Sequence, residues 1–123
     1  MMEFLGKGKK DRITEFVKFV KKELDLEKCP TIVLQNGKGN LKTTANYDYT
    51  KENKVIRVNA KNRAMVDVMR SIAHEMVHHK QFEQGRLKVQ PPDIGGEIED
   101  EANARAGQYI KIFSKMDETI YDE

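Results

Sequence analysis

The sequence contains little of what several classes of protein require. Its 123 residues include one cysteine, three histidines and no tryptophan. A lone cysteine, Cys29, excludes an intramolecular disulfide, which agrees with a reducing compartment. No apolar run approaches the ~20 residues of a membrane-spanning helix, and the opening MMEFLGKGKKDR has no apolar segment of the kind that a signal peptide needs. We therefore expect a cytoplasmic protein without a membrane partner.

An excess of charge of one sign is also missing. Lys and Arg number 22 and Asp and Glu number 20, which leaves a net charge of +2. This balance gives no support to nucleic acid as the main partner, although basic residues crowd the first 28 positions. The length suits one modest core. We expect a single domain over residues 1–123, with residues 1–10 and 116–123 as loose tails.

Hydrophobic periodicity predicts an α+β domain. Apolar residues recur at helical spacing over residues 11–24, 62–83 and about 97–115. Between the first two helices, residues 31–35, 43–49 and 54–60 carry the β-branched and alternating patterns of strands. Asn36-Gly37 is a strong signal for a tight turn. The sequence therefore predicts a helix, a three-stranded meander and two further helices.

The first of the two later helices contains the motif HEMVH, formed by His74, Glu75 and His78. Two histidines four residues apart lie on one face of a helix and can bind one metal ion. The glutamate lies about 100° around the helix, since a turn takes 3.6 residues. It is therefore better placed to accept a proton from a metal-activated water than to bind the ion. A pair of helical histidines that binds nothing is the alternative explanation.

A catalytic metal of this kind needs a third ligand, and no histidine is available for it. His79 lies about 100° from His78 on the helix, so we expect it at a solvated rim. The third ligand must be an acidic residue or Cys29, which comes from the other half of the chain. Acidic residues cluster at the start of the last helix, where the helix dipole alone could favour them. Small residues follow, which would let two helices approach closely. The acidic candidates are Glu97, Glu99, Asp100 and Glu101, and the small residues are Ala102, Ala104 and Ala106.

With HEMVH followed by Glu99-Asp100-Glu101-Ala102-Asn103, the chain resembles the gluzincins, a family of zinc metallopeptidases. It is most similar to ImmA/IrrE-type metallopeptidases, to minimal gluzincins and to small phage-encoded zincin-like proteins. The resemblance implies a zincin-like fold with an active-site helix and a C-terminal glutamate helix. It implies one Zn²⁺ per chain, held by His74, His78 and Glu99, with Asn103 orienting a ligand histidine. Glu101 is the alternative third ligand.

The resemblance further implies that the chain hydrolyses peptide bonds, with Glu75 as the general base. The substrate would be a peptide or protein in extended conformation, pairing with a free edge of strand 54–60, where Arg57 and Asn59 are candidate contacts. Family members use a His or Tyr to stabilise the oxyanion, and here the candidates are Tyr47, Tyr49, Tyr109 and Arg105. A phage-encoded protein in the host cytoplasm fits the same expectation.

Two other functions stay open at this point. The chain has no further histidine for the oxyanion and is small, so a zincin-fold binding or regulatory module, catalytically weak or latent, is the alternative. A nucleic-acid-associated protein that uses the basic N-terminal helix is the third hypothesis.

Overall fold

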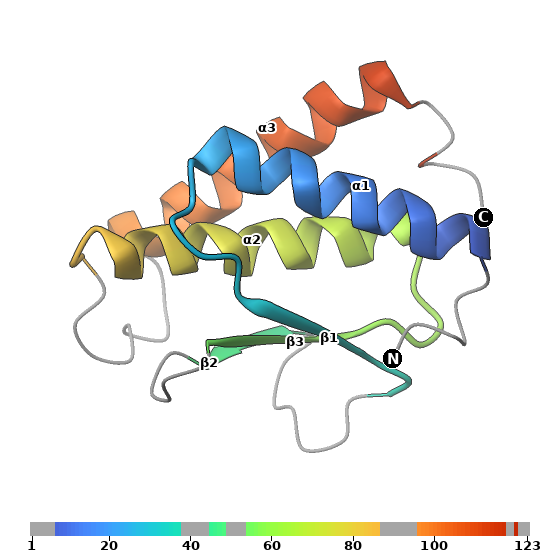
Figure 1. Cartoon of the computed structure of the whole chain (residues 1–123), viewed down its shortest axis with the longest axis horizontal. Coiled ribbons are helices and arrows are strands. Elements are labelled where there is room, and N and C mark those ends of the chain that lie inside the picture. The colour runs from blue at the N-terminus through green and yellow to red at the C-terminus, as the bar shows by residue number, and fades with distance from the viewer. Residues whose placement is uncertain (1–6, 38–44, 49–53, 87–95, 118–119, 121–123) are drawn as a thin grey trace.

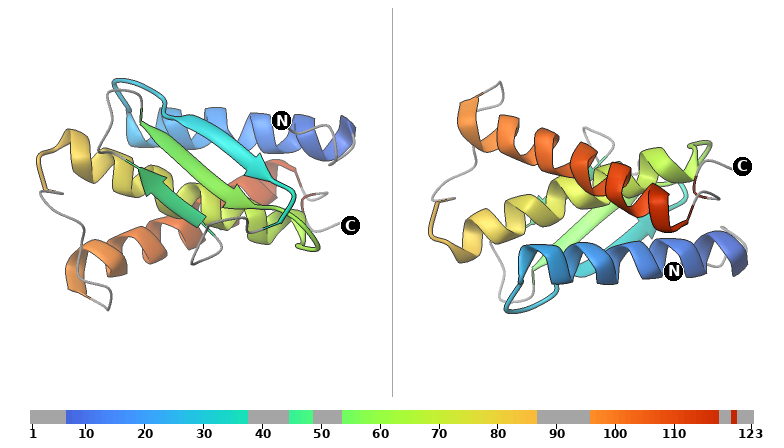
Figure 2. Two further views of the ribbon diagram at one scale, coloured as in Figure 1. Left: turned by 90° about the horizontal axis from the view of Figure 1, so that it is seen from below. Right: turned by 90° about the horizontal axis from the view of Figure 1, so that it is seen from above.

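The computed structural model describes residues 7–37, 45–48, 54–86, 96–117 and 120. Helix α1 (Lys7–Leu24) is followed by strands β1 (Thr31–Gln35), β2 (Ala45–Asp48) and β3 (Val55–Asn59), and then by helices α2 (Met65–Glu83) and α3 (Gly96–Met116). The α+β class and the predicted order of elements are confirmed. The helices lie on one side of the sheet, with α3 crossing α2 on the side away from the strands (Figures 1 and 2).

The strands do not form the predicted meander. The sheet order is β1-β3-β2, with β1 parallel and β2 antiparallel to β3. Asn36-Gly37 is therefore not the turn of a hairpin from β1 to β2. Instead, the Asn59 side-chain oxygen accepts hydrogen bonds from the backbone N–H groups of Gly37 (3.1 Å) and Lys61 (3.0 Å). These bonds join the ends of two parallel neighbours, and they give Asn59 a structural role.

The central position of β3 overturns the predicted mode of substrate binding. Both edges of β3 are hydrogen-bonded, one to β1 and the other to β2, so it offers no free edge to an extended peptide. Ile56 and Val58 are fully buried beneath the helices. Because side chains alternate between the faces of a strand, Arg57 lies on the face turned away from α2. Arg57 is therefore not a contact for a substrate bound at α2.

Helix α2 is the central element of the core. It packs against α1, α3, β2 and β3. The predicted apolar stripe of α1 is confirmed, with Phe16 and Val20 fully buried in the same cluster as Met69 and Ile72 of α2. Within the described residues, no helix is long and apolar enough to cross a membrane.

Several residues of the expected loose tails belong to a helix or to the core. Lys7 to Lys10 belong to α1, and Ile120 is fully buried in the core. The Arg12 guanidinium lies 3.7 Å from the Asp117 carboxylate, which ties the start of α1 to the end of α3. The first turns of α1 contain only polar residues and glycine, so hydrophobic periodicity could not reveal them.

Candidate metal centre

Helices α2 and α3 bring together the three residues His74, His78 and Glu99. The Nε2 atoms of the two histidines lie 3.1 Å apart. The Glu99 carboxylate reaches both rings, with Oε1 3.3 Å from His74 Nε2 and Oε2 2.7 Å from His78 Nε2. One nitrogen or oxygen atom from each residue lies within 4.8 Å of the others. The histidines come from one face of α2 because they are four residues apart.

Small residues on α3 allow the close approach of the two helices. Ala102 and Ala106 are buried, at 0% and 1% exposure, on the face of α3 that packs against the core. Larger side chains at these positions would push the backbones apart, since interiors are close-packed. Glu99 lies three residues before Ala102, on the same side of α3. The alanines therefore position the carboxylate against the histidines.

This donor set fits a divalent metal ion. Two neutral imidazoles and one carboxylate are the ligands of many catalytic zinc sites, which leave a further position open. Ligands about 2.0–2.1 Å from a tetrahedral zinc lie about 3.3 Å from one another. The separations of 3.1 Å between the two nitrogens and 3.3 Å between His74 Nε2 and Glu99 Oε1 are close to that value, while Glu99 Oε2 lies at hydrogen-bond distance, 2.7 Å, from His78 Nε2. The same donors also bind iron, cobalt, nickel and manganese, so the donor set alone does not select one metal.

Glu75 lies beside the triad but has a different environment. Its Oε2 atom is 3.9 Å from His74 Nε2, and the residue is 9% exposed. Burial, and then repulsion from Glu99, raises the pKa of Glu75 to about 8. Buried carboxyls near a second carboxylate resist ionisation because water is excluded and like charges repel. In the metal-free protein Glu75 is therefore protonated near neutral pH.

The raised pKa predicts a pH-dependent stability of the metal-free protein. Between pH 4.5 and about 8, Glu75 carries a proton in the folded protein but not in the unfolded chain. Stability therefore falls as pH rises through this window. Glu75→Gln removes the effect, and we expect it to be more stable than the wild type by about 4 kcal/mol at pH 8, since one pKa unit corresponds to 1.36 kcal/mol.

Urea unfolding of both proteins in chelator, at a series of pH values, measures the difference. A free-energy difference between the two that stays constant from pH 4.5 to 8 would contradict the shift. Comparing the two proteins cancels the contributions of the other titrating groups.

His74 is held in the form that binds metals. Burial, followed by the proximity of His78, lowers the pKa of His74. The Glu99 carboxylate and a side-chain hydrogen bond with Asn103 act in the opposite direction. Asn103 is four residues after Glu99 on α3, so the two share a face of the helix. The structure thus places Asn103 against His74, where the resemblance implied an orienting residue.

Glu101, the alternative third ligand, binds other groups. Its Oε1 atom accepts hydrogen bonds from Gln81 Nε2 and from the Arg86 guanidinium, both at 2.8 Å. The bond from Gln81, with smaller contributions from Arg86 and Arg105, lowers the pKa of Glu101. The group of close metal-ligand atoms contains Glu99 and not Glu101.

Sequence reasoning missed Gln81, which is fully buried beside the site. Its side-chain oxygen lies 2.7 Å from His78 Nδ1. The signal was available, because residues three apart on a helix are neighbours.

The expectation that His79 lies at a solvated rim was wrong. His79 is buried, and it contacts Tyr47. His79 is 3% exposed, with Nε2 2.7 Å from the Lys28 carbonyl oxygen and 3.2 Å from Glu83 Oε2. Because both partners are acceptors, Nε2 carries a proton. The Tyr47 hydroxyl lies 2.6 Å from Nδ1, within hydrogen-bond distance. Tyr47 is therefore bound to His79, about 100° around α2 from His78.

The remaining oxyanion candidates also have other partners. Tyr109 is 6% exposed and packs edge-on against Phe19 of α1. The Arg105 guanidinium donates to the Tyr109 hydroxyl at 3.4 Å and lies 3.9 Å from Glu101 Oε2. Tyr49 lies outside the described residues.

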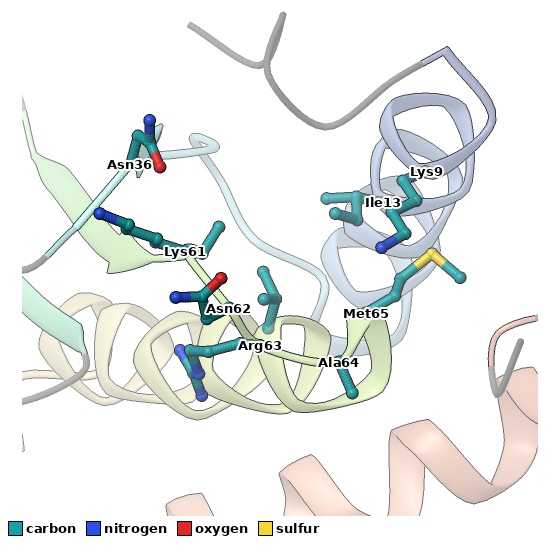
Figure 3. Close-up of a pocket in the computed structure, with 10 residues that line it drawn as sticks. Lys9, Ile13, Asn36, Lys61, Asn62, Arg63, Ala64 and Met65 are labelled. Atoms are coloured by element: carbon teal, nitrogen blue, oxygen red, sulfur yellow. The ribbon is translucent and has the colours of Figure 1, made fainter. Parts of the chain in front are cut away.

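A separate hollow of about 500 Å³ lies at the start of α2 (Figure 3). Lys9, Lys61 and Arg63 give it a basic lining. The Arg63 guanidinium donates to the backbone oxygens of Asn59 and Asp67 and to Ser71 Oγ. Arg63 therefore joins the end of β3 to α2, which is a structural role. The hollow precedes His74 along α2 and includes none of the triad.

Comparisons of the chain with protein-family models, with curated proteins and with solved structures found no match.

Proposed function

We propose that this protein is a zinc-dependent metallopeptidase with a zincin-like fold, related to the gluzincins. The observation that supports it most is the convergence of His74, His78 and Glu99, with Glu75 beside them. The motif HEMVH by itself allows a pair of helical histidines without a function. The presence of a carboxylate from a second helix, within 3.3 Å of both rings, favours a metal site.

Each residue has a role set by its chemistry. A bound zinc ion supplies Lewis-acid chemistry, polarising a carbonyl and making a coordinated water more acidic. His74, His78 and Glu99 would hold the ion. Glu75 accepts the proton of the attacking water and passes it to the leaving amine. A cation next to Glu75 also offsets the repulsion from Glu99, which favours the ionised carboxylate that a base needs. Asn103 orients His74.

The test is cleavage by purified protein loaded with one equivalent of zinc. We expect cleavage of a mixture of unstructured peptides, with the products identified by mass spectrometry. Dialysis against a chelator should abolish cleavage, and added zinc should restore it. Stoichiometric zinc without cleavage of any peptide in a broad library would contradict the peptidase.

A metal-binding regulatory module with little turnover is the second candidate function. It is favoured by the partners of the predicted oxyanion residues. Tyr47 is bound to His79, and Arg105 and Tyr109 contact each other. Among these described candidates, none is held free to stabilise an oxyanion at the triad. Tight zinc binding together with a specific protein partner, and without hydrolysis, would support this function.

A further inference from the structure

The amide of Gln81 has an orientation that its partners determine. Its Nε2 atom lies 3.0 Å from the Ile98 carbonyl oxygen and 2.8 Å from Glu101 Oε1. Both partners are acceptors, and only the amide nitrogen can donate to them. A flipped amide would place an oxygen against two other oxygens. The Gln81 oxygen must therefore be the atom that faces His78.

This orientation requires a hydrogen on the Nδ1 atom of His78. Gln81 Oε1 lies 2.7 Å from His78 Nδ1, and an amide oxygen can only accept. His78 Nδ1 therefore holds a hydrogen that it donates to Gln81. Gln81 is fully buried and His78 is 6% exposed, so bulk water does not compete for this bond. The other nitrogen, Nε2, points at Glu99 and His74.

The Glu101 carboxylate, which accepts a hydrogen bond from Gln81, also lies close to two arginines. Glu101 Oε1 accepts from Arg86 at 2.8 Å, and Oε2 lies 3.9 Å from Arg105. The end of α2 positions Arg86. Gly85 has a φ of 74°, in the left-handed region that favours glycine, and the Arg86 N–H bonds to the Gln81 carbonyl oxygen at 2.9 Å. This turn places the Arg86 side chain beside Glu101 of α3.

We propose that Gln81 is a positioning residue for the metal centre, which connects the Glu101 carboxylate to His78 and selects Nε2 as the ligating nitrogen. The inference rests on the metal site of the proposed function but does not need peptide hydrolysis. Histidine ligands usually donate their second N–H to a carboxylate, a carbonyl or water. Here a neutral amide stands between the ring and the carboxylate, so the negative charge of Glu101 stays one residue away from the ion.

The test compares zinc affinity in four proteins by competition with a chromophoric chelator. Gln81→Met keeps an unbranched buried side chain but loses both hydrogen bonds, and we expect zinc affinity to fall about 10- to 100-fold. Glu101→Gln removes the charge and keeps an acceptor for Gln81, so a smaller loss is expected. Asp100→Asn is the matched control, because it removes the same charge from an exposed neighbour on α3. It should bind zinc as the wild type does.

A second measurement reports the position of the proton directly. Long-range ¹H–¹⁵N spectra of the zinc-loaded wild type should show His78 with a protonated Nδ1 and a zinc-bound Nε2. The Nδ1 proton should exchange slowly with water, and it should exchange fast in Gln81→Met. Glu101→Gln keeps the proposal testable if Gln81→Met does not fold, since the Glu101 side chain is 27% exposed and its replacement leaves the core intact.

The outcomes separate this inference from the proposed function. Zinc bound through Nδ1 overturns the inference alone. Wild-type affinity in Gln81→Met, or in Glu101→Gln if Gln81→Met does not fold, also overturns the inference alone. An equal loss in Asp100→Asn and Glu101→Gln also overturns it, because a general effect of charge would then explain both. A wild type that binds zinc but cleaves no peptide overturns the peptidase alone. A wild type that binds no zinc overturns both.

Discussion

Glu75→Gln is expected to reduce the rate of peptide cleavage about 10²- to 10⁴-fold, the range that a general base contributes. Glutamine keeps the size of the side chain but cannot accept the proton of the attacking water. Glu75 is not among the three close ligand residues, so zinc should still bind with one equivalent per chain. The measurement is kcat and KM on a peptide identified in the cleavage screen, together with zinc content. The decrease should be in kcat, because the substitution removes an interaction made in the transition state.

Glu97→Gln is the matched control for this prediction. It makes the same chemical change at an exposed position in the first turn of α3. Cleavage by this variant should equal that of the wild type. If Glu75→Gln retained full activity with zinc bound, Glu75 would not be the base, and a different proton acceptor would be required.

Glu99→Gln is expected to weaken zinc binding more than about 100-fold, beyond the usual effect of losing a residue that only supports a ligand. The amide is a poorer ligand than the carboxylate and does not offset the charge of the ion. Zinc at 100 times its Kd stabilises the wild type by about 2.7 kcal/mol, which corresponds to a rise in Tm of about 10 °C for a domain of this size. Calorimetry with and without zinc should show this rise in the wild type and not in the variant.

Glu101→Gln tests whether Glu99 or Glu101 is the third metal ligand. Glu101 contacts Gln81 and Arg86, so its variant should keep most of the stabilisation by zinc. His78→Ala, which removes a ligand from the other helix, should behave like Glu99→Gln. If Glu101→Gln lost the stabilisation and Glu99→Gln kept it, Glu101 would be the third ligand.

The helices of this protein could be predicted from the sequence, but the pairing of its strands could not. Periodicity of 3.6 residues depends on local geometry, and it located α2 and α3 within a few residues. Strand order depends on contacts between distant segments, for which a turn signal is weak evidence. Asn36-Gly37 suggested a hairpin, yet Gly37 binds the side chain of Asn59, 22 residues later. The parallel pairing of β1 with β3 followed from such non-local bonds.

Part of the candidate site could likewise be predicted from the sequence, and part depended on tertiary packing. His74, Glu75 and His78 lie within five residues of one helix, so their spacing alone established two neighbouring imidazoles and an adjacent carboxyl. The resemblance to gluzincins selected Glu99, but the acidic segment itself left several carboxylates open. Only the packing of α3 on α2 separated them, because it turned Glu99 toward the histidines and Glu101 toward Arg86.

The sequence by itself determined the helices, the pair of histidines and the glutamate between them, because each depends on residues at most a few positions apart. The tertiary structure alone decided the strand order, the partners of Tyr47 and His79, and the orientation of the Gln81 amide. These features depend on which donors and acceptors meet when distant segments pack, since buried polar groups must find partners. The buried Gln81 amide meets this requirement by contacting His78 through its oxygen.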